Sequence, residues 1–256
     1  MKFSILISSF NKGKYLQECI KSCLNQKEKD YEIILFDNYS TDKTNYILKD
    51  FKKKIKIFKK KKISKSASLN QIDLIKNAFK KSKGKIICLL DADDYFNINK
   101  LIKIKKIFSE KKKLNVIFDL PVKRYALNQK KKFINKKKFQ KNIWPTIIPT
   151  SGISCRRLFF KNFLKENFIN KYENLEIDFR LNVYARNLST NYFISNDDLT
   201  NYRQVNDGIM SNIKKYSKKW WIKRHEAHNF MQKLFFKYNK KYNNKIDFLL
   251  SRILSK

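Results

Sequence analysis

Several residue types that define whole classes of protein are scarce in this sequence. Its 256 residues include only four glycines and three prolines, which excludes collagen-like and low-complexity linker sequences. Four cysteines are too few for a disulfide-stabilised scaffold of this length, so we expect four reduced thiols. No apolar segment approaches the roughly 20 residues of a membrane-spanning helix, and residues 1–10 lack the cleavage site of a signal peptide. These absences predict a cytoplasmic protein.

Acidic residues are scarce relative to basic ones. The chain has 22 Asp and Glu residues against 59 Lys and Arg residues, which gives a formal net charge of +37. Such a charge attracts nucleic acid, acidic lipid or phosphorylated substrates. Lys, Asn and Ile are all abundant, as an AT-rich coding sequence would produce, so the charge alone does not identify the partner.

Two kinds of apolar segment alternate over the first 95 residues. Short, almost wholly apolar runs predict strands, and apolar residues at three- to four-residue spacing predict helices between them. This alternation is typical of a parallel sheet with helices on both faces, the arrangement of nucleotide-binding α/β folds. Hydrophobic residues make up 42% of the chain, enough for a sizeable core, which excludes wholesale disorder. The predicted strands cover residues 3–9, 31–36, 55–58 and 86–90, and the predicted helices cover residues 11–24, 42–51 and 69–81.

The remaining sequence is less regular. We predict a helix over residues 101–108, a strand over 116–118, a helix over 173–184 and a strand over 192–194. The C-terminal extension, residues 213–256, interleaves aromatic residues with lysines in a helical pattern. Such helices suit the anionic cytoplasmic surface of a membrane. The alternatives are a pair of helices packed on the rest of the protein and the interface of a homodimer.

Three carboxylates directly follow the strand predicted at 86–90. Asp91, Asp93 and Asp94 stand at the carboxyl end of that strand, where open parallel sheets bind their ligands. Carboxylates this close repel one another unless a cation or hydrogen bonds offset the repulsion. Their oxygens suit Mg²⁺ or Mn²⁺, commonly shared with the phosphates of a nucleotide. The cluster therefore predicts a divalent-metal site, and the alternative is an acidic turn that caps the next helix.

Three segments resemble glycosyltransferase family 2. The first is residues 10–16, Phe-Asn-Lys-Gly-Lys-Tyr-Leu, at the end of the first predicted strand. The second is residues 37–44, Asp-Asn-Tyr-Ser-Thr-Asp-Lys-Thr, a few residues after Glu-Ile-Ile. The third runs from Gly84 through the Asp-Ala-Asp-Asp sequence at 91–94 to Lys100-Leu101 and is similar to the D-x-D region of the family. The resemblance is close over residues 3–108 and loose beyond them.

The resemblance implies a GT-A fold, which is a Rossmann-like, mostly parallel sheet flanked by helices. It further implies an inverting enzyme that binds a nucleoside-diphosphate-sugar and a divalent cation, Mn²⁺ or Mg²⁺. On this basis we divide residues 1–212, the GT-A domain, into a nucleotide-sugar-binding half (1–108) and an acceptor and catalytic half (109–212), followed by the basic helical C-terminal extension.

The resemblance also implies the donor contacts. Asp91 would approach the ribose, Asp93 would bind the metal and Asp94 would support the metal site. Asn38 departs from the family, which usually has a second acid there. Because an amide can accept a hydrogen bond from a base N–H and can also donate one, we expect nucleotide binding to be retained, with a UDP-sugar as the donor. The residues implied to hold the base and ribose are Phe10, Asn11, Asp37 and Asn38.

An inverting transfer needs a carboxylate to take the proton of the acceptor hydroxyl. In the family this is usually the Asp of a Glu-Asp pair, six residues before an Arg, and the corresponding positions here are Glu173-Asn174 and Arg180. Because an amide cannot act as the base, we rank Glu173 first, Asp178 second and Glu176 third. Glu176 and Arg180 are four residues apart, which favours a surface ion pair on a helix.

Arg203 follows a tyrosine in a segment that resembles the part of the family that closes over the diphosphate. It is a candidate for contact with the phosphates or the acceptor, and a structural salt bridge is the alternative.

These features predict a metal-assisted, inverting glycosyltransferase. It would transfer a sugar to a hydroxyl of a glycan or lipid-linked acceptor in surface polysaccharide synthesis, in the cytoplasm or at the inner face of the cell membrane. One alternative is a sugar nucleotidyltransferase, although the glycine-rich phosphate loop typical of that class is missing after the first strand. The other is a basic nucleic-acid-binding protein, which would explain the charge but not the three aspartates, so we expect no nucleic-acid partner.

Overall fold

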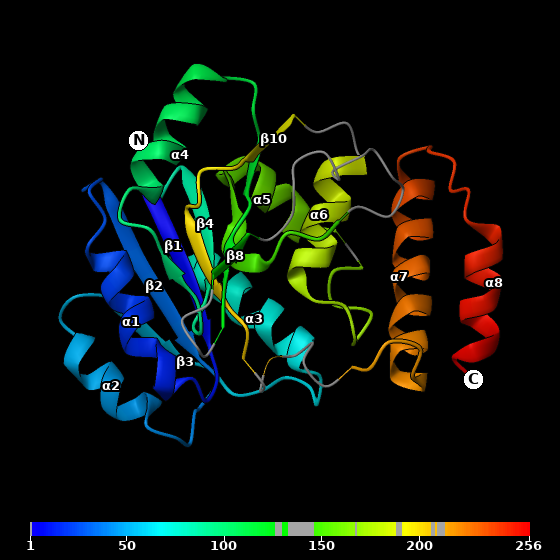
Figure 1. Cartoon of the computed structure of the whole chain (residues 1–256), viewed down its shortest axis with the longest axis horizontal. Coiled ribbons are helices and arrows are strands. Elements are labelled where there is room, and N and C mark those ends of the chain that lie inside the picture. The colour runs from blue at the N-terminus through cyan, green and yellow to red at the C-terminus, as the bar shows by residue number, and fades with distance from the viewer. Residues whose placement is uncertain are drawn as a thin grey trace.

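A computed structural model describes residues 2–125, 130–132, 146–166, 168–187, 191–205, 208 and 213–256. Its centre is a seven-stranded sheet with the order β10-β6-β9-β4-β1-β2-β3 (Figure 1). Strand β1 pairs in parallel with both β2 and β4, and β9 runs antiparallel between β4 and β6. The predicted, mostly parallel sheet is therefore confirmed. Its strands are β1 (Phe3–Ser9), β2 (Tyr31–Asp37), β3 (Lys56–Lys59), β4 (Ile86–Asp91), β6 (Val116–Asp119), β9 (Ile153–Arg156) and β10 (Tyr192–Ser195).

Helices cover both faces of this sheet, which explains why its central strands are apolar throughout. Alternate residues of β1 point to opposite faces, so Ile5 and Ile7 join one core cluster while Leu6 joins the other. Helices α1 (Gly13–Leu24), α2 (Thr44–Phe51) and α4 (Lys100–Glu110) pack on the Ile5 side. Helices α3 (Ala67–Lys81), α5 (Arg157–Leu164) and α6 (Ile177–Asn187) pack on the Leu6 side.

A second, four-stranded sheet lies beside the first and has the order β5-β11-β7-β8. Its strands are β5 (Tyr95–Phe96), β11 (Thr200–Arg203), β7 (Val122–Arg124) and β8 (Lys130–Lys132). Asn201 of β11 pairs with Tyr95 of β5, directly after the acidic residues 91–94. The small sheet thereby brings Arg203 next to the end of β4. The sequence pattern did not predict these short strands.

The C-terminal extension forms two helices, as predicted. Helix α7 (Lys218–Lys237) stands beside α6, and α8 (Lys245–Leu254) lies outside α7 (Figure 1). Phe230, Met231 and Leu234 of α7 are buried in the same core cluster as α5 and α6. Helix α7 therefore shares a core with the domain that precedes it. Among the helices that the structure describes, none has both the length and the apolar composition to cross a membrane.

The four cysteines are buried and free, as expected. Burial raises the pKa of the Cys23 thiol to about 12 and that of Cys88 to about 11, so both are protonated at neutral pH. They behave as small core residues.

Candidate active site

The parallel strands end together at one edge of the main sheet. The register places Ser8 beside Asp91 and Ser9 beside Asp37. A cleft of about 880 Å³ opens at this edge. Eight of the residues considered for the site line the cleft: Phe10, Asn11, Asn38, Asp91, Asp93, Glu176, Asp178 and Arg203. Three predicted residues are not among its lining residues: Asp37, Asp94 and Glu173.

Asp37 shapes the turn that follows β2. Its side chain is fully buried, and both oxygens accept hydrogen bonds from Ser40, one from the backbone N–H (2.8 Å) and one from the hydroxyl (2.6 Å). Asn11 closes the same turn, because its Oδ1 accepts the backbone N–H of Thr41 at 2.8 Å. Asn38 donates from Nδ2 to the carbonyl of Lys60 at 2.7 Å. The implied contact of Asp37 with a nucleotide remains a prediction, and in this structure its carboxylate is committed to Ser40.

Gly13 is required by the close approach of this turn to α1. A Cβ added to Gly13 would lie 2.8 Å from the backbone N of Thr44, a distance that side chains do not adopt. The N–H of Gly13 donates to Asp42 at 2.9 Å. The glycine thus lets the start of α1 sit against the turn, which places Asn11 at the cleft.

Asp91 and Asp93 form the acidic wall of the cleft. Gln71 of α3 donates to Oδ1 of Asp91 at 2.7 Å. Burial, followed by the charge of Asp93, raises the pKa of Asp91 to about 7. Lys12 lies 3.0 Å from the carboxylate of Asp93 and offsets part of this repulsion. The two carboxylates therefore form a site at which an added cation would be favourable.

Asp94 lies behind the cleft. It is fully buried, Oδ2 accepts the hydroxyl of Ser151 at 2.6 Å, and Oδ1 accepts the backbone N–H of Arg203 at 2.8 Å. Burial, followed by the charges of Asp93 and Asp91, raises the pKa of Asp94 well above its usual value. Its implied part in a metal site remains a prediction, and these contacts make that part an indirect one, since Asp94 ties β11 and Ser151 to the acidic turn.

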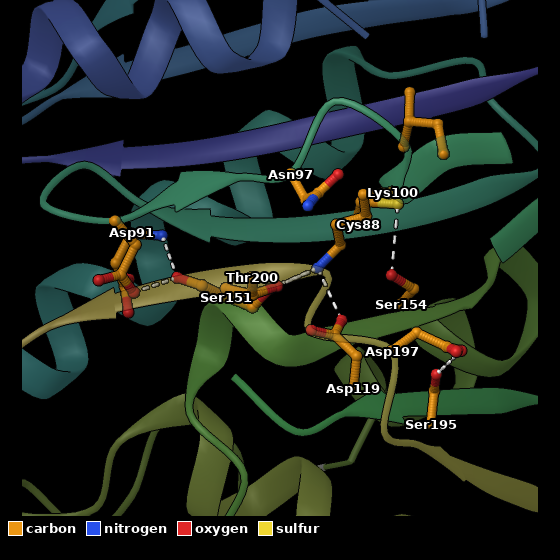
Figure 2. Close-up of polar contacts among 12 residues, drawn as sticks. Cys88, Asp91, Asn97, Lys100, Asp119, Ser151, Ser154, Ser195, Asp197 and Thr200 are labelled. Atoms are coloured by element: carbon orange, nitrogen blue, oxygen red, sulfur yellow. Dashed lines mark hydrogen bonds and ion pairs between the residues drawn. The ribbon is translucent and has the colours of Figure 1, made fainter. Parts of the chain in front are cut away.

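A buried lysine holds this arrangement from behind. The ammonium of Lys100 donates to Asp119 (2.7 Å), to the carbonyl of Ser151 (2.8 Å) and to the hydroxyl of Thr200 (2.6 Å), as Figure 2 shows. These three acceptors use all three ammonium protons. Ser151 also accepts the backbone N–H of Asp91 at 3.0 Å. Lys100 thus connects α4, β6, β11 and the 3-10 turn at Thr150–Gly152 (η2) to the acidic wall. Sequence analysis identified Lys100 only within the segment that resembles the family and predicted none of these contacts.

The donor set of the cleft fits a cation shared with a ligand. Among the described residues, no three His, Cys, Asp or Glu side chains are grouped closely enough to hold a metal ion alone. Asp91 and Asp93 nevertheless supply carboxylates to the same cleft. Mg²⁺ sites commonly use one or two protein carboxylates and complete their coordination with substrate phosphates and water. The residues present therefore fit a divalent cation that binds together with a diphosphate.

The structure distinguishes the three candidates for the base. Glu173 is exposed and does not line the cleft, whereas Glu176 and Asp178 do. Burial, followed by the charge of Glu176, raises the pKa of Asp178 to about 8, against the opposing effect of Lys223. A carboxylate with a pKa near neutrality suits proton abstraction. Its position favours Asp178 over Glu173, the residue that the sequence ranked first.

The predicted ion pair between Glu176 and Arg180 is wrong. Helix α6 begins at Ile177, so Glu176 lies just before the helix, and both Glu176 and Arg180 are buried rather than paired at the surface. The buried Arg180 donates instead to backbone carbonyls, including Ile169 (2.8 Å) and Tyr172 (2.6 Å). Glu176 pairs with Lys223 of α7 at 2.5 Å.

Arg203 makes the salt bridge that was the alternative for it, and its contact with the phosphates or the acceptor remains a prediction. It lines the cleft, and its guanidinium also pairs with Glu18, donates to the backbone carbonyl of Asp93 (2.5 Å) and lies 4.5 Å from the centre of the Tyr95 ring. These contacts hold a positive charge beside the acidic wall.

The sequence matches a family of known chemistry. The model of the family described as glycosyl transferase family 2 matches residues 4–168. The chain belongs to glycosyltransferase family 2. This membership confirms the resemblance and excludes the sugar nucleotidyltransferase and the basic nucleic-acid-binding protein as the class of this domain.

A relative of known activity matches most of this family 2 chain. The chain is 29% identical over 229 residues to the poly(ribitol-phosphate) beta-N-acetylglucosaminyltransferase TarP of Staphylococcus aureus, over 82% of this chain and 65% of TarP. The chain spans between 24% and 37% of the length of three other curated relatives, all named as uncharacterised glycosyltransferases.

Two solved structures have the same fold. One is TarS 1–349 of S. aureus in complex with UDP-GlcNAc, with a TM-score of 0.62, 16% identity and coverage of 98% of this chain and 79% of that chain. The other is the mannosyltransferase PcManGT of Pyrobaculum calidifontis in complex with GDP-Man and Mn²⁺, with a TM-score of 0.58, 13% identity and coverage of 99% and 68%. These likenesses confirm the GT-A fold.

Proposed function

We propose that this family 2 domain catalyses an inverting transfer of a sugar from a UDP-sugar to a hydroxyl of a glycan or lipid-linked acceptor in surface polysaccharide synthesis. The observation that carries the proposal is that Asp91, Asp93 and Asp178 line one cleft and that the pKa of Asp178 is raised to about 8. A base poised near neutral pH beside an acidic wall suits the transfer of a sugar from a diphosphate.

The donor would lie along the carboxyl ends of β1, β2 and β4. Phe10, Asn11 and Asn38 line the part of the cleft next to the turn after β2 and would contact the base and ribose. UDP-GlcNAc in the TarS complex supports a uridine donor. Asp91 would approach the ribose, in keeping with its place at the end of the central strand β4.

The diphosphate would lie against Asp93 and Arg203. Asp93, with Asp91 beside it, would hold Mn²⁺ or Mg²⁺, and the Mn²⁺ in the PcManGT complex supports this assignment. When bound, the cation would offset the negative charge that develops on the leaving diphosphate. Arg203 lines the same part of the cleft and would add a fixed positive charge for the phosphates.

Asp178 would act as the base. Its carboxylate would take the proton of the acceptor hydroxyl while that oxygen forms a bond to the anomeric carbon. The bond from the anomeric carbon to the diphosphate oxygen breaks at the same time, and its electron pair leaves with the diphosphate. Attack opposite the leaving group inverts the configuration of the anomeric carbon. Asp178 carries the proton away.

The acceptor class is supported by the charge of the cleft. The exposed Lys62 and Lys65 both line it, in a chain with a net charge of +37. TarP acts on poly(ribitol-phosphate), as its name states. A polymer that carries both hydroxyls and phosphates is therefore an informative first acceptor to assay.

Helix α8 would place the enzyme at the inner face of the cell membrane. Ile246, Leu249, Leu250 and Ile253 are exposed along one side of the helix, while Asp247 faces inward and pairs with Arg224 of α7. An exposed apolar side with cations at its edge suits an anionic bilayer, and these cations are Lys245, Arg252 and Lys256.

Co-sedimentation with vesicles containing phosphatidylserine tests this placement. Binding that salt weakens and that Leu250→Glu abolishes would support it. Concentration-dependent dimerisation without lipid, abolished by the same substitution, would assign the surface to a homodimer and overturn the membrane proposal.

Thermal stabilisation by UDP tests the proposed function. We expect UDP to raise the melting temperature in the presence of Mn²⁺. We expect any effect of oligonucleotides to disappear at about 0.5 M salt, which screens the attraction between exposed charges. Release of UDP from UDP-sugars, screened one donor at a time, then identifies the sugar. Stabilisation by oligonucleotide alone would contradict the proposal.

A further inference from the structure

Helix α7 makes two polar contacts with the segment that precedes Asp178. Glu226 accepts two hydrogen bonds from Asn174, from the backbone N–H and from Nδ2, both at 2.8 Å. Lys223 donates to both carboxylate oxygens of Glu176 at 2.5 Å. Because Lys223 and Glu226 are three residues apart, they lie on the same side of α7. One side of this helix therefore holds residues 174–176 at two points.

Apolar contacts support the same docking. Phe230 of α7 is fully buried, and its ring lies 5.3 Å from Phe168, 5.9 Å from Tyr172 and 6.0 Å from Phe179. The three partners come from the chain on both sides of residues 174–176. Edge-to-face aromatic pairs at these distances favour one orientation over others. The segment before Asp178 is thus packed on α7 as well as hydrogen-bonded to it.

The segment itself has no regular structure to fix its path. Tyr172 has a φ of +71°, in a region that side chains with a Cβ rarely adopt. Its carbonyl accepts the guanidinium of Arg180, which also binds the carbonyl of Leu175. A strained backbone of this kind persists only where surrounding contacts determine it. Here the surrounding contacts come from Arg180 and from α7.

Asp178 follows Glu176 by two residues, so residues 174–176 lead directly into the start of α6, where its carboxylate lies. We propose that α7 is a positioning element of the active site, in which Lys223 and Glu226 hold residues 174–176 and thereby direct Asp178 into the cleft. The proposal rests on the proposed role of Asp178 as the base. It gives α7, which lies beyond the part of the chain that matches the family model, an indirect part in catalysis through the position of Asp178.

The Asn174–Glu226 contact explains how this chain uses an asparagine at position 174. The amide donates to the carboxylate of Glu226, whereas an aspartate there would bring two carboxylates together. The pair provides a test with opposite predictions. If α7 positions Asp178, Asn174→Asp lowers turnover, and Glu226→Gln in the same chain restores it because the new amide can donate to the new carboxylate.

The experiment measures release of UDP from UDP-N-acetylglucosamine by the full chain with Mn²⁺. We expect Asn174→Asp and Lys223→Met each to lower kcat by about 10-fold or more, since a small misplacement of a catalytic group has effects of this size. The KM for the donor and the affinity for UDP should change by less than about twofold, because a positioning effect acts on the chemical step rather than on donor binding. Lys219→Met, which alters an exposed lysine of the same helix, is the matched control and should leave kcat unchanged.

The outcomes separate this proposal from the proposed function. Restoration of kcat in Asn174→Asp/Glu226→Gln, with KM and UDP affinity of the single variant close to those of the wild type, supports the positioning role, because retained donor binding shows that Asn174→Asp is folded. Should any variant fail to fold, Glu226→Gln alone retains the size of the side chain and is expected to give an intermediate kcat. If Asn174→Asp raises kcat, or if all α7 variants match the wild type while Asp178→Asn is inactive, the positioning role of α7 is wrong. If Asp178→Asn is itself active, the base assignment is wrong instead.

Discussion

Asp178, at the start of α6, and Asp91, at the end of β4, line the same cleft, and the charge of Asp91 helps to raise the pKa of Asp178. Burial and the charge of Glu176 contribute more to this shift. The acidic wall that suits a cation thus also affects the group that would take the proton. Any positive charge bound at Asp91 would lower the pKa of Asp178, so donor binding and base strength are coupled.

The pH dependence of kcat/KM should report Asp178. Because its pKa is raised to about 8, the carboxyl is largely protonated at lower pH, and activity should rise with pH and level off above about pH 8. Glu176→Gln removes the charge that raises this pKa most, so the midpoint should move to lower pH. The check is a pH–rate profile of both proteins. The assignment would be contradicted if the midpoint moved upward in Glu176→Gln. It would also be contradicted if the wild-type profile had no midpoint between roughly pH 5 and 9, the range in which such bases work.

Asp93→Ala should abolish the Mn²⁺-dependent part of UDP binding while the protein stays folded. The side chain of Asp93 contacts Lys12 at the cleft, and the hydrogen bond from Arg203 uses the backbone carbonyl, which the substitution retains. Calorimetric titration with UDP, with and without Mn²⁺, measures the effect. Asp50→Ala, in an exposed position on α2, is the control. Unchanged metal-dependent binding in Asp93→Ala would remove Asp93 from the metal site.

Lys100→Met should destabilise the protein strongly. The substitution leaves the fully buried carboxylate of Asp119 without its cation, and breaking a buried pair in this way costs about 3–5 kcal/mol. Lys105→Met on the same helix breaks a more exposed pair with Glu28 and should cost no more than about 1 kcal/mol. Urea unfolding compares the two variants. Equal losses would show that the buried pair contributes no more than the surface one.

Glu32 should make stability depend on pH under acidic conditions. Burial acts to raise its pKa, but hydrogen bonds from Lys56, from the N–H of Lys83 and from Ser4 outweigh burial and lower the pKa to about 2. A lowered folded-state pKa means that the stabilisation is complete above the ordinary value of 4.5 and is lost as the pH falls toward 2. The difference in free energy of unfolding between wild type and Glu32→Gln should therefore shrink over that range. A constant difference would be inconsistent with this account.

The fold and the acidic wall could be predicted because their signals are local. The apolar runs of β1, β2 and β4 identify a parallel sheet, and the aspartates at 91 and 93 directly follow one of these strands. Asp178, the second-ranked candidate for the base, lies at the same cleft, and its role stays a prediction.

The remaining features depend on contacts between distant segments. Spacing suggested that Glu176 pairs with Arg180, but each finds a better partner elsewhere: Glu176 binds Lys223 of a later helix, and Arg180 turns back to the carbonyls of an irregular segment. Lys100 reaches Asp119 and Thr200 only in the folded chain. The spacing of apolar residues along the sequence does not predict such contacts, because they depend on how distant segments pack together.

Turnover of Asp178→Asn tests the central claim most directly. The asparagine keeps the size of the side chain and removes its ability to take a proton, so UDP release from UDP-N-acetylglucosamine should fall by about 10²–10⁴-fold, with the affinity for UDP unchanged. Near-normal turnover in Asp178→Asn would contradict the account, because the carboxylate at the start of α6 would then not be the base.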